Sequence, residues 1–253
     1  MPEPTVLLDD VRVTYLRGGM RNRQRVEALD GVSLSIEPGE TVGLVGESGS
    51  GKTTLAKVAL GLVKPTSGRM VFEGVPIDSR RRATKGRMQV VLQHPDWSLN
   101  PYLRVGSSIS EPLAIVGIGN RRDRALRARE MLEDVGLDSR FADRYPHELS
   151  GGQRQRVAIA RALITHPAFI VFDEVVSALD VSVQAQILNL IRRLQAERGF
   201  SALFISHDLA VVRYVARRIA VLRLGQLVEV SDSSVFYTQP QHPYSRQLVE
   251  ASA

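Results

Sequence analysis

The feature that most constrains the fold is a glycine-rich segment, GESGSGKT at residues 46–53, placed directly after a short apolar run. Gly46 and Gly51 enclose four residues before Lys52 and Thr53, the G-x-x-x-x-G-K-[ST] pattern of loops that hold polyphosphates through backbone N–H groups. Residues 41–45 have the length and composition of a buried parallel strand, and residues 54–60 continue as a helix whose N-terminus favours an anion. Strand, loop and helix together predict an α/β fold with a phosphate site.

Each residue type in the loop has a chemical reason. Glycines at 43, 46, 49 and 51 supply permissive backbone, because a side chain would keep the loop from approaching the phosphates. The Lys52 ammonium is expected to reach the β- and γ-phosphates, and the Thr53 hydroxyl to ligate Mg²⁺. The pattern therefore predicts a bound polyphosphate together with Mg²⁺.

A second segment, LSGGQRQRV at residues 149–157, is more specific. Alone it predicts only a turn that opens a helix, with Ser150 as the N-cap. It resembles the signature motif of ATP-binding cassette (ABC) ATPases, which other proteins with this phosphate loop lack. The resemblance implies that Ser150 and the amides of Gly151 and Gly152 contact the γ-phosphate bound by a partner subunit, a role that suits a helix N-terminus.

The other parts expected of such a cassette follow in order. FIVFDE at residues 169–174 resembles the Walker B strand, which implies that Asp173 holds Mg²⁺ and Glu174 orients or deprotonates the attacking water. SALD at 177–180 resembles the D-loop of the dimer seam. Val175 stands where most family members have proline, and we expect little effect on the chemistry.

Two strand ends and one aromatic complete the predicted site. ALFISHD at 202–208 matches the family's switch histidine, so His207 is expected at the γ-phosphate. Gln93, after the apolar run 88–92, resembles the glutamine that touches Mg²⁺ or water and reports to a membrane partner. Tyr15 is the candidate for stacking on adenine, although glycines and arginines in residues 16–26 leave its alignment open. The predicted catalytic residues are Lys52, Gln93, Glu174 and His207; the metal ligands Thr53, Gln93 and Asp173; and the nucleotide ligands Tyr15, Gly46, Glu47, Ser48, Gly49, Ser50, Gly51, Lys52, Thr53, Thr54, Ser150, Gly151, Gly152, Gln153 and Asp180.

Composition is consistent with this interpretation. The 253 residues are 43% hydrophobic, no run approaches the roughly 18 apolar residues of a membrane span, and the N-terminus MPEPTVLLDD does not resemble a secretory signal. With no cysteine, disulfides and thiolate metal sites are excluded. These features predict a chain that stays in the cytoplasm.

A net charge of +6 is compatible with nucleic acid, an anionic membrane surface or a solvated basic face, and we favour the last two. The basic cluster Arg80, Arg81, Arg82, Lys85 and Arg87 has no interleaved aromatic residues. The other basic stretch, 121–129, predicts an amphipathic helix with Ala125, Ala128, Leu132 and Val135 on its apolar face. No nucleic-acid partner is expected.

The chain has three zones. Residues 4–40 alternate polar and apolar residues and predict antiparallel strands closed by a turn at Pro38 and Gly39, whereas 41–93 and 158–224 predict a parallel core. The pattern of residues 101–150 predicts helices throughout. We therefore expect one ABC ATPase domain over residues 1–253: a P-loop NTPase parallel core with the N-terminal antiparallel β subdomain (4–100 and 151–253) and an inserted α-helical signature subdomain (101–150).

Two stretches resemble one subfamily. QHPDWSLNP at 93–101 is similar to the glutamine-loop region of ATPases that drive dipeptide, oligopeptide and nickel import, with His94 in place of the usual acidic residue. QHPYSRQL at 241–248 is similar to their H-P-Y-[ST] tail. Trp97 is either a coupling contact or a core aromatic residue.

The resemblance implies the ATP-hydrolysing subunit of a bacterial-type ABC importer for di- or oligopeptides or nickel. It also implies two permease subunits, a second ABC ATPase subunit in a homo- or heterodimer, and an extracytoplasmic substrate-binding protein. The expected location is peripheral, on the cytoplasmic face of the inner (plasma) membrane. The alternatives are an exporter subunit, or a soluble ABC protein of DNA maintenance or translation. The cargo itself cannot be read from this chain.

Overall fold

A computed structural model describes residues 3–17, 24–77 and 84–251. The chain divides into two compact units, residues 1–83 with 201–253, and residues 84–200. The second unit contains the whole predicted helical subdomain together with flanking core segments, and the predicted boundaries at 101 and 150 stay a prediction. No helix of the described ranges has the length and apolarity to cross a membrane.

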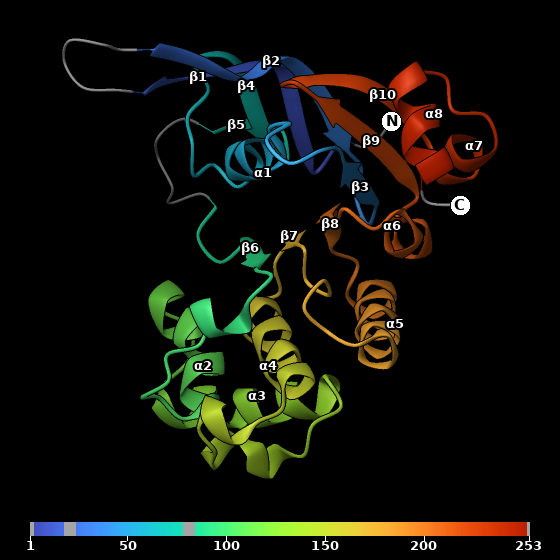
Figure 1. Cartoon of the computed structure of the whole chain (residues 1–253). Coiled ribbons are helices and arrows are strands. Elements are labelled where there is room, and N and C mark those ends of the chain that lie inside the picture. The colour runs from blue at the N-terminus through green and yellow to red at the C-terminus, as the bar shows by residue number, and fades with distance from the viewer. Residues whose placement is uncertain (1–2, 18–23, 78–83, 252–253) are drawn as a thin grey trace. The chain divides into compact units, whose positions relative to one another are not determined.

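The first unit contains an antiparallel sheet in the order β2-β1-β4-β5 (Figure 1). Strand β1 pairs with β2 from Val6 opposite Ile36 onward, and buried Val11 and Val13 alternate with exposed Arg12. The prediction of antiparallel strands in residues 4–40 is confirmed. The strands of this sheet are β1 (Val6–Arg17), β2 (Gln24–Ile36), β4 (Ser67–Phe72) and β5 (Val75–Pro76).

The assignment of all of residues 41–93 to the parallel core is wrong. Strand β4 pairs antiparallel with β1, with Val6 opposite Phe72, and β5 pairs with β4. The reason is topological: after α1 the chain returns to the edge of β1, where Met70 and Phe72 bury their side chains.

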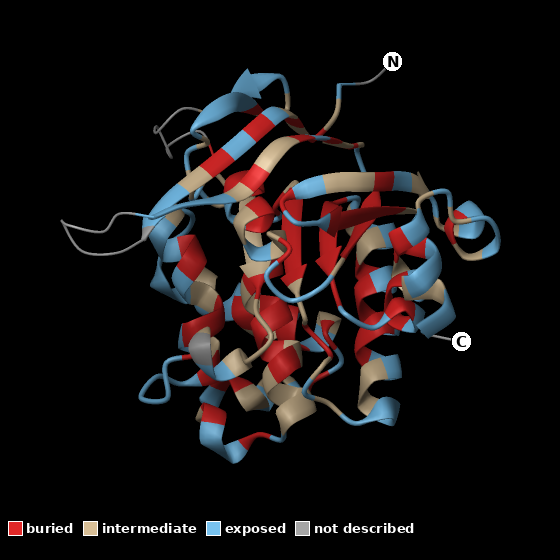
Figure 2. Cartoon of the chain, turned by 45° about the horizontal axis from the view of Figure 1, so that its top comes forward, coloured by how far each residue is buried: buried red, intermediate tan, exposed pale blue. Residues whose placement is uncertain are grey.

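The strand that leads into the phosphate loop lies in a second sheet of this unit. The strand order is β10-β9-β3-β8, with β3 (Thr41–Val45) parallel to β8 (Ser201–Ile205) and β9 (Arg218–Arg223), and β10 (Gln226–Asp232) antiparallel to β9. Every residue of β3 and β8 is buried (Figure 2). Such continuous burial is typical of parallel strands covered by other elements, as the apolar runs predicted.

Helix packing explains one glycine differently from the prediction. Gly43 lies inside β3, and a Cβ there would come 2.3 Å from Cγ1 of Val212 in α6 (Leu209–Val215). Gly43 lies in the predicted strand 41–45, but it permits close helix–strand packing and does not supply backbone freedom to the phosphate loop, contrary to expectation. The other helices of this unit are α1 (Lys52–Ala59), α7 (Ser233–Thr238) and α8 (Pro243–Ala251).

A buried ion pair anchors the start of β3. The Glu40 carboxylate, whose side chain is 4% exposed, accepts hydrogen bonds from Arg218 Nε at 2.6 Å and Nη2 at 2.9 Å, and Arg218 Nη2 also donates to the Ser35 carbonyl. Burial raises the pKa of Glu40, but the hydrogen bonds from Arg218 and the Glu37 amide outweigh it and leave this pKa below its ordinary value. The pair joins the ends of β2, β3 and β9.

The second unit is mainly helical, as predicted for residues 101–150. Its parallel strands β6 (Met88–Val91) and β7 (Phe169–Asp173) pair with Met88 opposite Phe169. Helix α2 packs against α3 and α4, and α4 packs on β6. The helices are α2 (Val105–Val116), α3 (Arg121–Asp134), α4 (Gly151–Leu163) and α5 (Val181–Arg198), with 3₁₀ turns at Pro95–Trp97, Ser139–Asp143 and Pro146–Glu148.

The predicted apolar face of α3 is correct except at its start. Ala128 and Leu132 are buried, and so is Val135 at the C-cap. Ala125 is exposed and lines a surface hollow beside Asn120, because the first turns of α3 lie at the surface. Arg80, Arg81, Arg82, the segment 18–23 and the Trp97 side chain lie outside the described residues.

Candidate active site

The phosphate loop is shaped by a backbone conformation that residues other than glycine rarely adopt. Gly46, Gly49 and Gly51 have φ of +149°, +80° and +109°. A Cβ on Gly46 would lie 2.1 Å from the Leu222 carbonyl oxygen, and one on Gly51 would lie 2.5 Å from that of Ala28. At Gly49 nothing lies within 4 Å of the Cβ position. The loop is closely packed at both ends and open in the middle.

Lys52 gives this loop its positive charge. Its Nζ donates to the carbonyl oxygens of Gly46 at 2.6 Å and Glu47 at 2.8 Å, so the ammonium lies over the start of the loop. Ser50 is buried, and its Oγ has no hydrogen-bond partner among the described residues. Thr53 is exposed on the first turn of α1. A glycine-rich loop, a cation and a helix N-terminus are a combination that can bind an anion.

His207 emerges from the same sheet edge as this loop. It follows β8, the parallel neighbour of β3, so both segments leave the carboxyl ends of adjacent strands. The turn is braced locally: Asp208 N donates to Ser206 Oγ at 3.0 Å, and the Asp208 carboxylate caps α6 by accepting from the Ala210 and Val211 amides. His207 is exposed. Tyr15, in the same unit, is 38% exposed on β1.

In the second unit, Asp173 is the last residue of β7 and Glu174 follows it, and Gln93 follows the adjacent parallel strand β6. Glu174 has φ of +50°, a conformation that is uncommon outside glycine and is found where surrounding structure imposes it. Gln93 Nε2 donates to Ser177 Oγ at 2.9 Å, and Ser177 Oγ donates to the Glu174 carbonyl at 2.9 Å. This chain of hydrogen bonds links the predicted glutamine to the turn that holds the predicted base.

The signature segment begins α4 with a capping box. Ser150 Oγ accepts from the Gln153 amide at 3.3 Å, and Gln153 Oε1 accepts from the Ser150 amide at 3.0 Å. The N-cap assignment of Ser150 is confirmed. Arg154 Nη1 donates to the Asp96 carboxylate at 2.8 Å, which ties this helix to the segment after Gln93.

The first turn of α5 packs against the signature glycine Gly152. A Cβ on Gly152 would lie 2.7 Å from Val183 Cγ1, so a larger residue would require Val183 to shift. Asp180 caps α5, because its carboxylate accepts a hydrogen bond from the Val183 amide at 3.0 Å. This bond, and to a smaller extent the bond from the Ser182 hydroxyl, holds the pKa of Asp180 below its ordinary value. Val175, at the position of the family's proline, is buried.

The predicted residues thus form two groups, one in each compact unit. Residues 46–54, His207 and Tyr15 belong to the first unit; Gln93, residues 150–153, Asp173, Glu174 and Asp180 belong to the second. The predicted Mg²⁺ ligands are divided between them, with Thr53 in the first. Sequence reasoning missed three contacts: Ser177 between Gln93 and Glu174, the Arg154–Asp96 pair, and Tyr244, whose hydroxyl accepts from the Glu47 amide. In the sequence, Tyr244 stands out only as part of the H-P-Y pattern.

Comparison with known proteins identifies the family. The profile of the family described as ABC transporter matches residues 29–177, more than half of the chain. The "Putative peptide import ATP-binding protein BAB2_1053" of Brucella abortus is 51% identical over 231 residues, which cover 89% of this chain and 69% of that protein. A protein of the same description from Brucella ovis, BOV_A0347, is 50% identical over 89% of this chain and 73% of its own length.

Solved structures agree. The dimeric post-hydrolysis state of the ATP-binding cassette MJ0796, bound to ADP and Pi, superposes with a TM-score of 0.77 at 33% identity and covers 90% of this chain and 98% of that one. Clostridium perfringens cbiO1, part of the ABC transporter complex cbiONQ, gives a TM-score of 0.82 at 26% identity over 98% of this chain and 99% of its own. The chain therefore belongs to the ABC transporter family, as one of its ATP-binding and ATP-hydrolysing cassettes.

Proposed function

We propose that the phosphate loop is the nucleotide site of this ATPase and that the residues predicted from the sequence carry the reaction. The observation that supports this most is the loop itself, a cradle closed by glycine at both ends with the Lys52 ammonium over it. Backbone N–H groups of residues 46–54, other than the Glu47 amide that donates to Tyr244, bind the phosphates. Lys52 pairs with the β- and γ-phosphates, and Tyr15 stacks on the adenine.

Mg²⁺ fits the chemistry of the donors assigned to it. Thr53 offers an exposed hydroxyl, Asp173 a carboxylate at a strand end, and Gln93 an amide oxygen, since its amide nitrogen is already bonded to Ser177. Oxygen donors of this kind, with one carboxylate and the substrate phosphates, are what Mg²⁺ prefers. When bound, the ion neutralises charge that develops on the phosphoryl group.

Hydrolysis is assigned to Glu174, His207 and Gln93. Glu174 orients and deprotonates the water that attacks the γ-phosphorus in line, and His207 donates to the γ-phosphate. Gln93 contributes to positioning that water. Because Gln93 is bonded through Ser177 to the Glu174 backbone, a shift of the segment after β6 is transmitted to the base.

We further infer that the signature acts on a second cassette. Ser150 Oγ accepts the Gln153 amide, and a hydroxyl that accepts still has its own hydrogen to donate to a phosphate. Together with the Gly151 and Gly152 amides it forms an anion-binding helix start. The solved dimer of MJ0796 with ADP and Pi supports pairing of two cassettes, with the same chain or a related one as the partner.

The coupled process that we propose is import of peptides. The names of the Brucella relatives favour peptides over nickel, the other cargo of the subfamily. The proposal includes two permease subunits, an extracytoplasmic binding protein, and a peripheral position on the cytoplasmic face of the membrane.

Affinity purification of the tagged chain from its native membranes with Mg-ATP tests this proposal. Recovery of two permeases and a binding protein that retains peptides is the expected result. Recovery of a nickel-binding protein instead would change the cargo class, and recovery of ribosomes, DNA or no membrane protein would contradict the importer assignment.

A further inference from the structure

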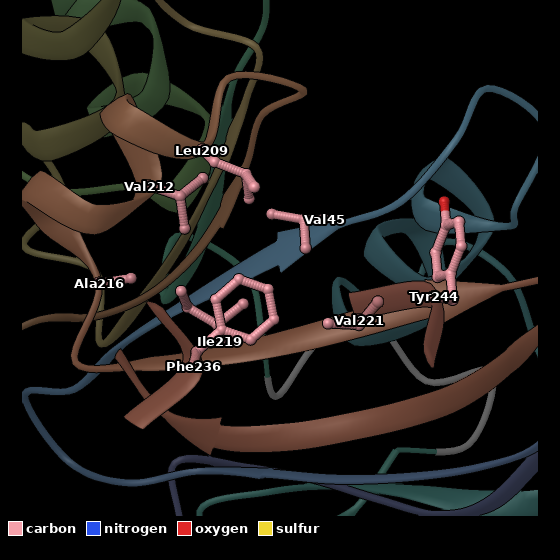
Figure 3. Close-up of a cluster of buried hydrophobic side chains, with 8 residues drawn as sticks. All are labelled: Val45, Leu209, Val212, Ala216, Ile219, Val221, Phe236 and Tyr244. Carbon is pink, nitrogen blue, oxygen red and sulfur yellow. The ribbon is translucent and has the colours of Figure 1, made fainter. Parts of the chain in front are cut away.

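The C-terminal helices α7 and α8 pack against the strands that support the phosphate loop. Phe236 and Tyr244, 0% and 3% exposed, share one apolar cluster with Val45, the last residue of β3, and Val221 of β9 (Figure 3). All of these residues belong to the first unit. The tail is therefore continuous with the core under the phosphate loop.

One polar contact reaches from this tail into the loop. The Glu47 amide, the first after Gly46, donates to the Tyr244 hydroxyl at 3.0 Å, across 197 positions of sequence. The Tyr244 ring is buried, with the Arg223 guanidinium 4.8 Å from its centroid. A buried ring of this size has little rotational freedom, so its hydroxyl is a fixed acceptor.

The turn that carries Tyr244 is itself held. Its amide donates to His242 Nδ1 at 3.1 Å, and the amides of Gln241 and His242 donate to the Glu229 carboxylate at 3.1 and 2.9 Å. Glu229 is 8% exposed on β10. A buried carboxylate that accepts charge-assisted hydrogen bonds is a strong anchor for this turn.

Both ends of the Glu47 residue are thus bonded by different partners. Its carbonyl accepts from Lys52 Nζ, whereas its amide donates to Tyr244. The hydrogen bond to Tyr244 uses the Glu47 amide and not its carbonyl, so it does not depend on whether Lys52 bonds that carbonyl or a phosphate.

We propose that Tyr244 is a positioning residue for ATP, which fixes the first turn of the phosphate loop through the Glu47 amide and so preserves the nucleotide-binding conformation. The inference rests on the proposed role of that loop. The H-P-Y segment would then increase nucleotide affinity by holding the phosphate loop in its binding conformation.

The test is the dissociation constant of a fluorescent ATP analogue with Mg²⁺, measured on the full chain together with KM and kcat for ATP hydrolysis. Tyr244→Phe removes only the hydroxyl, and loss of one neutral hydrogen bond predicts about three- to tenfold weaker binding. KM should rise by the same factor, with kcat within about twofold of wild type.

Tyr237→Phe is the matched control. Its ring is half-buried in the same segment and its hydroxyl donates to the Leu209 carbonyl, away from the phosphate loop, so nucleotide affinity should stay within about twofold of wild type. Glu229→Gln is a second variant that weakens the turn and keeps the tyrosine; it should weaken binding in the same direction as Tyr244→Phe.

Lys52→Ala separates the two levels of the argument. If it abolishes binding while Tyr244→Phe and Glu229→Gln bind as wild type, the positioning role is wrong and the phosphate site stands. Equal weakening by Tyr237→Phe and Tyr244→Phe would overturn the specific contact in favour of general loosening of the tail. Undiminished binding by Lys52→Ala would overturn the phosphate site and the inference together.

Discussion

Two helices of this protein begin at glycine-rich segments, and they begin in opposite ways. Helix α1 follows Gly51, a left-handed residue with no side chain to accept from the first amides. Helix α4 follows Ser150, which is part of a complete capping box with Gln153. Every helix leaves its first N–H groups without intrahelical acceptors, so the two segments meet the same requirement by different means.

The difference indicates that the two helix starts depend on different partners. At α1 the first turn offers amides and the Lys52 charge to a ligand, and the loop is shaped by packing against Leu222 and Ala28. At α4 the Ser150 side chain accepts one of the first free amides of the helix, so this helix start is formed without nucleotide. We expect the phosphate loop to depend on its ligand and the signature to depend on a second cassette.

The largest effect should come from Glu174→Gln, which leaves both helix starts intact. Loss of a general base lowers turnover by on the order of 10²–10⁴, while ATP still binds. Phosphate release and nucleotide binding measured on the same preparation test this. Hydrolysis comparable to wild type would remove Glu174 from the role assigned to it.

Glycine substitutions distinguish packing from openness within the phosphate loop. Gly46→Ala brings a Cβ to 2.1 Å from a backbone oxygen, and with the strained φ this should lower the free energy of unfolding by about 3 kcal/mol or more. Gly49→Ala meets no atom within 4 Å, so only the cost of φ +80°, about 1 kcal/mol, applies to folding. The loss of ATP-binding free energy in Gly49→Ala should exceed this folding cost, because the added methyl group enters the space where the phosphates bind.

Chemical denaturation without Mg-ATP measures the change in the free energy of unfolding, and the added stability with Mg-ATP measures the change in ATP binding. Equal losses of stability for the two variants would contradict the asymmetry between the ends and the middle of the loop.

The ion pair under β3 predicts a pH dependence. The pKa of Glu40 is lower in the folded protein than in the unfolded chain, so its contribution is present above the ordinary carboxylate pKa, about 4.3, and is lost as the pH falls through the lower folded value. In Glu40→Gln this part of acid destabilisation should disappear. At neutral pH, Arg218→Met should cost about 2–3 kcal/mol, less than a fully buried pair, because Arg218 is 25% exposed.

Unfolding at a series of pH values from 7 to 3 provides the measurement. A Glu40→Gln profile parallel to wild type over the acidic range would show that the pair does not have this linkage.

The fold was largely predictable because its strands are short apolar runs with polar ends. The local pattern predicts strands in residues 41–45 and, ending in polar residues, in 169–174 and 202–208; the structure has strands at Thr41–Val45, Phe169–Asp173 and Ser201–Ile205. Strand β4 was assigned to the wrong sheet, since its partner β1 lies some sixty residues away and pairing is not encoded in the local pattern. Gly43 was misread for a related reason: its neighbour Val212 is distant in sequence.

The candidate site shows the same limit. Its motif residues could be named because spacing in the chain reflects the geometry of one loop or one helix start. The contacts between motifs could not: Gln93 and Ser177 are 84 positions apart, and Glu47 and Tyr244 are 197 apart. Such contacts depend on tertiary packing, so the sequence supplies the chemical groups and only the structure shows which of them touch.

The smallest effect is expected at the signature cap, and it sharpens the opening comparison. Ser150→Ala removes the acceptor of the Gln153 amide and should cost about 1 kcal/mol of stability, whereas Ser150→Asp keeps an N-cap acceptor and should cost almost nothing. The ATPase rate should fall further in Ser150→Asp than in Ser150→Ala. Aspartate puts a negative charge where a γ-phosphate is bound, whereas alanine only removes one donor. Denaturation midpoints and ATPase rates of the two variants therefore separate capping from catalysis. If Ser150→Asp hydrolyses ATP faster than Ser150→Ala, the hydroxyl acts only as a cap and the signature contact belongs to the glycine amides alone.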